Sequence, residues 1–319
     1  MSHRKVDYRV RPAKSIERKM LVEAFRRLSE FGALNSYQYV GMGSLFFTDF
    51  TLVHRSLGIE SLISIEDTSD PAVKARFKFN VPFGHIDLRY GHSNTELTKV
   101  PWSARSIVWM DYDGTMERSV LRDVEYLAGV VPQGSIILFS VNASSLPKLE
   151  EEDGDASKVS LVDRLKQALG AHAVPYETKS SDLSGWGVAK VYREIIDSSI
   201  AKALVVRNSK LPPGAKLRYK QLFNFHYSDN AKMLTVGGVI YDAGQEATFA
   251  KCAFGQLGFI RPEADAFVID APNLTFREMR ELDAKLPHSA TGLPVPAADV
   301  EKYTRTYRYF PRFVEAELS

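Results

Sequence analysis

The sequence has a single cysteine, Cys252, among 319 residues. One thiol cannot build an internal disulfide framework or a cysteine-rich zinc site, so the composition favours a reducing compartment. No apolar run approaches the roughly 20 residues needed to cross a bilayer. The charged start, MSHRKVDYRVRPAK, lacks the apolar segment of a signal peptide. We therefore expect a cytoplasmic protein without a membrane-spanning segment.

The sequence also lacks an excess of charge of either sign. Lysine and arginine number 41 and aspartate and glutamate 39, a formal net charge of +2, so the overall charge neither requires nor excludes a polyanionic partner. The apolar fraction of 45% is enough to bury a substantial core, in one large domain or in a principal domain with an extension. Internal repeats and low-complexity linkers are absent from the chain.

An amphipathic helix is predicted before the first strand. Apolar residues recur with a helical period from Ser15 to Phe31, with Ser15 placed as an N-cap after Pro12 and Gly32 placed to end the helix. Nine lysines or arginines and three acids fall within residues 1–27. This end of the chain is therefore expected to be a basic helix.

Short apolar runs then alternate with helical patterns, which predicts parallel strands joined by right-handed helical crossovers. The five predicted strands are 37–43, 61–67, 85–91, 106–114 and 134–144. An acidic run at 149–158 predicts an exposed loop. Residues 221–242 alternate on both sides of SDNAK, the pattern of an antiparallel hairpin. We predict a doubly wound α/β fold with a mostly parallel, seven-stranded sheet that ends in this hairpin.

The predicted order of elements divides the chain into three parts. These are the N-terminal basic helix at 1–35, a Rossmann-like domain at 36–245 and a C-terminal α-rich extension at 246–319 that packs on the core.

A glycine turn, VGMGS, follows the first predicted strand. Its glycines, Gly41 and Gly43, let the backbone approach a ligand closely at the start of the next helix. A dinucleotide pyrophosphate needs a third glycine, and Phe46 takes its place, which disfavours a nicotinamide-dependent oxidoreductase. A cofactor with adenosine and no phosphate needs only the close turn and an acid that ends the second strand. Glu66, with Asp67 beside it, stands there; the alternative is that both acids cap the following helix.

The order and position of these features resemble the class I S-adenosylmethionine-dependent methyltransferases, over roughly residues 36 to 242. The resemblance implies S-adenosylmethionine as cofactor and a site that includes Gly41, Gly43, Ser44, Glu66, Asp67, His92 and Ser93. Two departures are present: the glycine signature is short, and the region after the third strand lacks its common aspartate. They leave open a degenerate member of the fold that serves as a binding subunit of a nucleic-acid-processing or defence complex.

The end of the fourth predicted strand, VWMDYDG, carries the candidate catalytic residues Asp111, Tyr112 and Asp113. Amino-directed methyltransferases have an Asp-Pro-Pro-Tyr type of turn here, whereas this chain has no prolines at that place. Metal-dependent O-methyltransferases hold a divalent cation with acids at this strand end, and Asn142 could supply a further oxygen. A third interpretation makes Asp113-Gly114 a turn and N-cap. No metal ligand set is assigned.

Other residues offer additional roles. His85 and His92 are candidate bases, and Lys14 could approach the cofactor or cover the pocket. The segment 180–190 is predicted to be a flexible lid or recognition loop, or else a disordered insertion. Basic and aromatic residues alternate at 302–313, which suits nucleic acid, or else rings that pack in the core beneath exposed arginines.

We therefore expect methyl transfer from S-adenosylmethionine, with Asp111 at the acceptor. Because positioning supplies most of the acceleration, the absence of a catalytic triad is no objection. The acceptor is left open between a hydroxyl compound and nucleic acid, and a protein partner is also left open.

Overall fold

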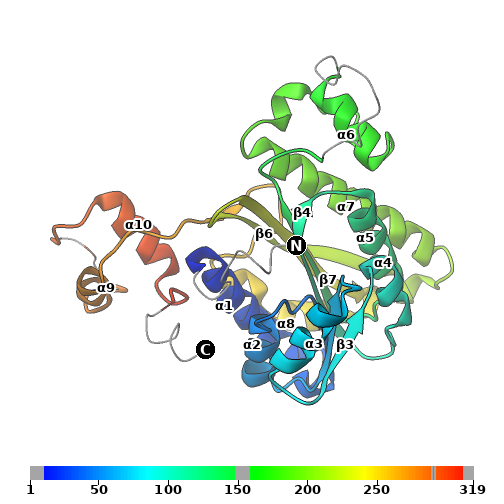
Figure 1. Cartoon of the computed structure of the whole chain (residues 1–319), viewed down its shortest axis with the longest axis horizontal. Coiled ribbons are helices and arrows are strands. Elements are labelled where there is room, and N and C mark those ends of the chain that lie inside the picture. The colour runs from blue at the N-terminus through cyan, green and yellow to red at the C-terminus, as the bar shows by residue number, and fades with distance from the viewer. Residues whose placement is uncertain (1–10, 148–158, 289, 291, 312–319) are drawn as a thin grey trace.

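A computed structural model describes residues 11–147, 159–288, 290 and 292–311, and the acidic run at 149–158, predicted as an exposed loop, lies outside them. Its centre is an eight-stranded sheet with the order β3-β2-β1-β4-β5-β7-β6-β8 (Figure 1). The first five strands pair in parallel, and β7 runs antiparallel to both β5 and β6. The strands are β1 Gln38–Gly41, β2 Ser61–Glu66, β3 Ile86–Tyr90, β4 Ser106–Thr115, β5 Ser135–Asn142, β6 Leu217–Ser228, β7 Lys232–Asp242 and β8 Phe267–Ile269.

The seven predicted strands are all present, and the sheet has one more. β8 comes from the C-terminal extension and pairs in parallel with β6, with Phe267 opposite Phe225. Three residues are too few to show an alternating pattern, so the sequence does not predict this strand. Its pairing with the edge strand β6 in the folded protein identifies it.

Helices cover both faces of the sheet, because alternate strand residues are buried on opposite sides. Tyr39 and Val40 on β1 belong to two different apolar clusters, for example. One face is covered by α1 Pro12–Arg26, α2 Thr48–Leu57, α3 Pro71–Asn80 and α8 Glu246–Lys251, and the other by α4 Ser93–Glu96, α5 Arg118–Val130, α6 Leu161–Leu169 and α7 Gly187–Asn208. The remaining helices, α9 Phe276–Asp283 and α10 Ala297–Thr306, lie to one side of the sheet (Figure 1). Among the described helices, none combines the length and the apolarity that a membrane crossing requires.

The N-terminal helix starts earlier than predicted, and its cap comes from elsewhere in the chain. α1 begins at Pro12, whose fixed φ suits a first helical position, and Ser15 is not its cap. Asp229, in the turn between β6 and β7, accepts hydrogen bonds from the amides of Ala13 at 3.1 Å and Lys14 at 3.0 Å. A carboxylate more than two hundred residues away thus satisfies amides that the start of a helix leaves unpaired.

The segment 180–190 has regular secondary structure, which contradicts the prediction of a disordered insertion. It forms a 3-10 turn at Ser180–Leu183 and then the first turn of α7. Trp186 stacks on His226 of β6, with ring centroids 4.7 Å apart and an interplanar angle of 9°. The glycine before this tryptophan, Gly185, has φ of +58°, a conformation that glycine adopts at little cost.

Candidate functional site

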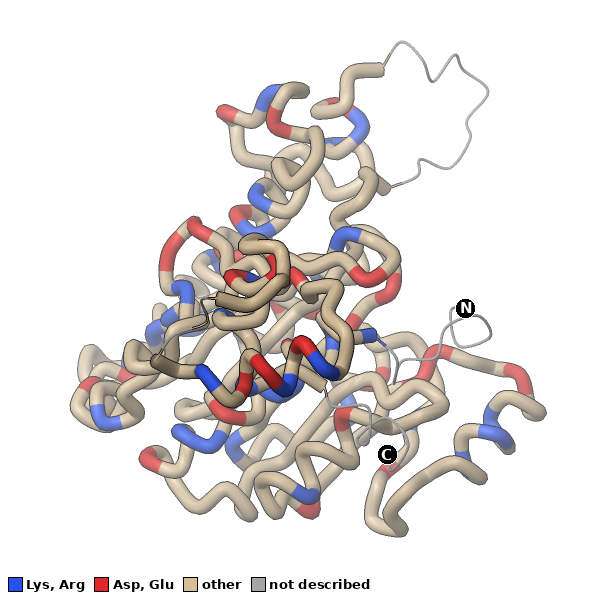
Figure 2. Tube along the Cα trace, turned by 90° about the vertical axis from the view of Figure 1, so that its left-hand side faces the viewer, with Lys and Arg blue, Asp and Glu red and all other residues tan. Residues whose placement is uncertain are grey.

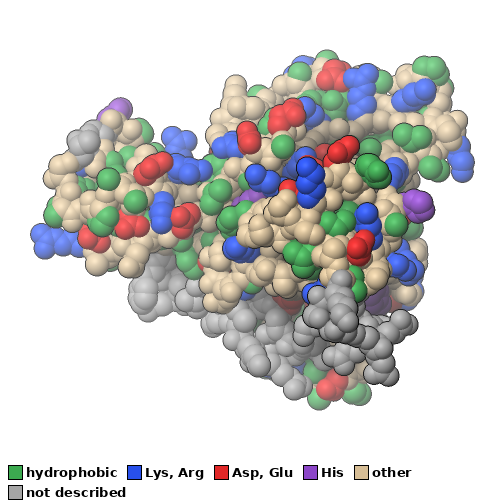
Figure 3. All heavy atoms as spheres, turned by 90° about the horizontal axis from the view of Figure 1, so that it is seen from above, with side chains coloured by type: hydrophobic (Ala, Val, Ile, Leu, Met, Phe, Trp, Pro, Cys, Tyr) green, Lys and Arg blue, Asp and Glu red, His purple; other side chains and the backbone are tan. Residues whose placement is uncertain are grey.

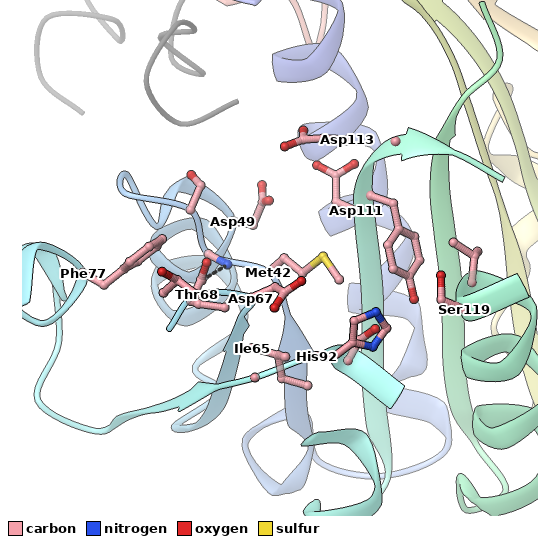
Figure 4. A pocket seen from close by; sticks show the side chains of 18 of the residues that line it. Met42, Asp49, Ile65, Asp67, Thr68, Phe77, His92, Asp111, Asp113 and Ser119 are labelled. Carbon is pink, nitrogen blue, oxygen red and sulfur yellow. Dashed lines mark hydrogen bonds between the residues drawn. The ribbon is translucent and has the colours of Figure 1, made fainter. Parts of the chain in front are cut away.

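A cavity of about 370 Å³ opens at the carboxyl ends of β1, β2 and β4 (Figure 4). This is the point where the strand order reverses beside β1, the place where doubly wound folds bind ligands. Nine of the ten predicted site residues line it: Gly43, Ser44, Glu66, Asp67, His92, Ser93, Asp111, Tyr112 and Asp113. Gly41 ends β1 just before this wall and does not line the cavity.

The turn after β1 needs a glycine for an internal reason. A Cβ added to Gly43 would lie 2.5 Å from Cδ1 of Phe47 and 2.7 Å from Oγ of Ser64, so the buried phenyl ring occupies the space of a side chain. Ser44 and Phe47 both have left-handed backbone conformations, with φ of 50° and 47°. Such positions are costly for residues other than glycine and are concentrated at ligand sites. Phe46 packs against the core and does not line the cavity.

A Gly43→Ala variant is therefore expected to be destabilised by about 2 kcal/mol, the cost of forcing a methyl group into a filled space. The matched control is Gly114→Ala, because Gly114 lines the same cavity and has no atom within 4 Å of an added Cβ. Urea unfolding of both variants measures the difference. Equal stabilities would contradict the packing argument.

Glu66 closes this turn from the neighbouring strand. Its Oε1 accepts hydrogen bonds from the amide of Gly43 at 2.8 Å and from Oγ of Ser64 at 2.7 Å. The side chain is only 7% exposed, and burial raises its pKa to about 7 against the opposing effect of these hydrogen bonds. The capping alternative is wrong, because the cap of α3 is Asp70, which accepts a hydrogen bond from the amide of Ala72.

Asp111 and Asp113 reach the cavity because β4 continues past them to Thr115 (Figure 4). The turn-and-cap interpretation of Asp113 is therefore wrong, and the N-cap position of α5 is held by Glu117. Both residues line the cavity, although the register of β4 against β5 shifts between Asp111 and Thr115. Tyr112 lies between them, and its hydroxyl donates a hydrogen bond of 2.6 Å to Asp123 of α5.

A buried lysine lies directly beneath the strand end. Nζ of Lys14 is 2.8 Å from Oδ1 of Asp111, 2.8 Å from Oε2 of Glu17 and 3.1 Å from the hydroxyl of Tyr227. It also lies 4.3 Å from the ring centroid of Trp109, within cation–π range. Burial works to lower the pKa of Lys14, but the carboxylates of Asp111 and Glu17 outweigh it and hold the pKa well above its usual range. Lys14 thus supports Asp111 from behind and does not cover the pocket.

The sequence-based interpretation missed a pair of charged residues that lines the same cavity. Arg18 of α1 donates from Nε to the carboxylate of Asp49 in the first turn of α2, and both line the cavity. Their contact depends on the packing of α1 against α2. No pattern in the sequence links residues 18 and 49.

A second missed residue, Asp123, joins two predicted regions of the site. Its buried carboxylate accepts hydrogen bonds from Ser93 and Asn94, which follow β3, and from Tyr112 of β4. A signal existed here, since an acid on the apolar face of an amphipathic helix needs partners inside the protein.

Of the remaining predicted residues, some line the cavity and others lie away from it. His92 lines the cavity, whereas His85 packs against His54 at a centroid distance of 4.6 Å, away from it. Oδ1 of Asn142 accepts a hydrogen bond from the amide of Ser144. Within the described ranges, no three His, Cys, Asp or Glu side chains gather as a metal site would require.

The sheet order, the antiparallel hairpin beside β5 and the helices on both faces define the fold of the class I methyltransferases. The sequence model of a family described as "Putative O-methyltransferase" matches residues 6–318. The chain belongs to that family, which confirms the resemblance drawn from its motifs.

Solved structures similar to this chain include methyltransferases, all of them distant. The complex of LepI with SAM has 13% identity and a TM-score of 0.33, and the match covers 64% of this chain and 43% of LepI. Mitomycin 7-O-methyltransferase MmcR has 15% identity and a TM-score of 0.32, over 70% of this chain and 54% of its own. A structure from Listeria monocytogenes described as a putative S-adenosylmethionine dependent methyltransferase has 10% identity and a TM-score of 0.37, over 68% and 97%. The comparison with curated proteins gave no significant match.

Proposed function

We propose that this protein transfers a methyl group from S-adenosylmethionine to a hydroxyl of a small polar acceptor. One observation is the main support for this proposal. The buried carboxylate of Glu66 is hydrogen-bonded to the amide of Gly43, and a single cavity runs from this pair to Asp111 and Asp113. Membership of an O-methyltransferase family supports the same reaction.

The residues present suit an adenosine that carries no phosphate. The cavity of about 370 Å³ is within the usual range for small-molecule sites. Glu66 ends β2, where its carboxylate would accept hydrogen bonds from the ribose hydroxyls. Ile65 and Phe77 offer apolar contacts for the adenine, and His92 and Ser93 line the same cavity.

The chemistry at the acceptor end requires little beyond alignment. When bound, the sulfonium of the cofactor supplies an activated methyl group. Asp111 and Asp113 would orient the acceptor hydroxyl and take up its proton as the new bond forms. The ion pair with Lys14 would hold Asp111 in one position for this role.

The charge of the cavity indicates which acceptors fit. Among the described residues, Arg18 is the one lysine or arginine that lines the cavity, and it is already paired with Asp49. Six carboxylates line the cavity: Asp49, Glu66, Asp67, Asp111, Asp113 and Glu117. Such a surface attracts a cation and repels phosphates. We therefore propose a neutral or positively charged hydroxyl compound as acceptor and consider nucleic acid a poor one.

Calorimetry tests the proposal most directly. S-adenosylmethionine and its demethylated product, S-adenosylhomocysteine, are expected to bind at micromolar concentrations. Transfer of a radiolabelled methyl group to pools of small molecules, RNA, DNA and protein then identifies the acceptor. Absence of binding together with co-purification of a partner protein would favour the degenerate binding subunit instead.

The affinity for S-adenosylhomocysteine is expected to rise with pH. Because the pKa of Glu66 is about 7 in the free protein, the carboxylate is mostly protonated at pH 6 and mostly ionised at pH 8. The ionised form is the better acceptor for the ribose hydroxyls, so the dissociation constant should fall by about tenfold over this interval. Calorimetry at several pH values measures the trend. A Glu66→Gln variant should remove it, and a wild-type affinity independent of pH would contradict the assignment.

A further inference from the structure

A second cavity, of about 440 Å³, lies where the C-terminal segment meets the edge of the sheet. Its wall comes from α1, from the segment that leads into β8, from β8, from the residues after α9, and from α10 with the residues that follow it. It shares no residue with the cavity described above. Three arginines line it: Arg261, Arg305 and Arg308.

Among the described residues that line this cavity, none is an acid that could pair with the three guanidinium groups. Nη1 of Arg261 donates to the carbonyl oxygens of Gly258 at 3.0 Å and Ile260 at 2.7 Å, which are neutral partners. Asp265, a nearby acid, is exposed on the loop before β8 and does not line the cavity. Burial and the positive charge of Arg305 both lower the pKa of Arg261. Like charges are therefore held close together at a place that an anion would stabilise.

Another acid, Glu23 of α1, is already engaged nearby. It accepts a hydrogen bond from the hydroxyl of Tyr309, whose ring packs edge-on against Phe259 at a centroid distance of 5.6 Å. Tyr303 is buried and Tyr309 and Phe310 pack against the core, as one of the two sequence-based interpretations predicted, whereas Phe313 lies outside the described residues. The arginines between them remain at the cavity.

Aromatic rings hold the guanidinium groups in place. Cζ of Arg261 lies 5.1 Å and Cζ of Arg305 5.0 Å from the ring centroid of Phe267, so one phenyl ring contacts both cations. Arg308 lies 5.9 Å from the ring centroid of Tyr307, another residue of the wall. Nε of Arg308 also donates to the hydroxyl of Tyr307 at 3.3 Å. Guanidinium groups held beside rings can direct their other N–H groups to the oxygens of a phosphate.

The surroundings favour a compact ligand over a polymer. The described helices beside the cavity carry both signs of charge, with Asp299 and Glu301 on α10 and Glu278 and Glu281 on α9 (Figures 2 and 3). Lys302 of α10 is paired with Asp270 at 2.9 Å. A nucleic-acid strand needs a continuous basic track, which the described part of this surface does not provide.

We propose that this arginine cavity binds a small phosphate ester that carries an aromatic or other ring. The phosphate lies among the guanidinium groups of Arg261, Arg305 and Arg308, and the ring lies against the aromatic wall. This site is separate from the proposed methyl-transfer site and does not depend on it.

Phenyl phosphate is the probe that tests the site, because it has the phosphate and the ring and lacks adenine. Calorimetry with the full chain, at low and at physiological salt, is expected to show saturable binding that weakens with salt. Arg305→Met should weaken it at least about tenfold, the value of a hydrogen bond to a charged group, and Arg305→Lys should weaken it less. The matched control is Arg277→Met, on α9 and outside the cavity wall, which should leave binding unchanged.

Four results would overturn the proposal. These are no binding of phenyl phosphate, equal binding of phenol, equal binding by the Arg305→Met variant with its melting temperature unchanged, or tighter binding of a single-stranded oligonucleotide that the same variant abolishes. The last result would assign the cavity to nucleic acid. If Arg305→Met lowers the melting temperature, Arg308→Met, in an exposed residue of the same wall, replaces it.

Discussion

Replacing Glu66 with alanine is expected to weaken the binding of S-adenosylhomocysteine by about a hundredfold. Two hydrogen bonds between ribose hydroxyls and an ionised carboxylate are worth about 3 kcal/mol together, and each 1.4 kcal/mol corresponds to a factor of ten. The substitution also removes the acceptor that orients the amide of Gly43, so the turn loses its hydrogen-bond partner. Calorimetry at pH 8, where the wild-type carboxylate is ionised, gives the full effect.

Two further variants separate this role of Glu66 from a general effect of charge. Asp87→Asn removes one negative charge from the adjacent strand β3, from an exposed side chain outside the cavity, and should change the affinity little. Glu66→Gln keeps a hydrogen-bond acceptor without the charge and should fall between wild type and alanine. An alanine variant that stays folded and binds within threefold of wild type would refute the assignment of Glu66 to the ribose.

A Lys14→Met variant is expected to lose about 3 to 5 kcal/mol of unfolding free energy, which is a large part of the stability of a typical domain. Lys14 is 1% exposed and Glu17 is fully buried, so the substitution leaves a carboxylate in the interior without its cation. Desolvation already raises the pKa of Glu17, and Lys14 is the main influence that opposes this. Urea unfolding at neutral pH measures the loss.

The double variant Lys14→Met/Glu17→Leu provides the control for this prediction. Removing both buried charges replaces an ion pair by apolar contacts, so the double variant should recover most of the stability that the single variant loses. Asp111 is partly exposed and can be solvated from the cavity, so its loss of a partner costs less. Two results would show that Lys14 does not hold this cluster together. One is a double variant whose loss of unfolding free energy equals the sum of the losses from the two single substitutions, and the other is a Lys14→Met variant within about 1 kcal/mol of wild type.

Much of the fold could be predicted because strands and helices have local signatures. Alternate residues of β1, β4 and β5 enter opposite apolar clusters, which is why these segments are apolar throughout and flanked by helical patterns. The candidate site was predicted by the same logic, since the carboxyl ends of parallel strands meet at one edge. Gly43, Glu66 and Asp111 therefore converge although 68 residues separate the first from the last.

Individual contacts could not be predicted where they depend on residues distant in the sequence. The sequence suggests Ser15 as the cap of α1, whereas the structure uses Asp229, because the β6–β7 turn folds over the helix start. The eighth strand has only three residues and is defined by its partner. Both features exist only once separate elements have packed together.

The sequence by itself determined the α/β architecture, the glycine turn and the acid that ends the second strand, because backbone geometry ties these to periodicity and to short spacings. Only the tertiary structure decided that Lys14 lies beneath Asp111, that Arg18 pairs with Asp49 and that three arginines share a cavity with Phe267. A buried charged side chain needs a partner of opposite charge, but the sequence does not specify which residue that partner is. The packing of α1 on α2 and of the C-terminal segment on β8 determines which residues become neighbours.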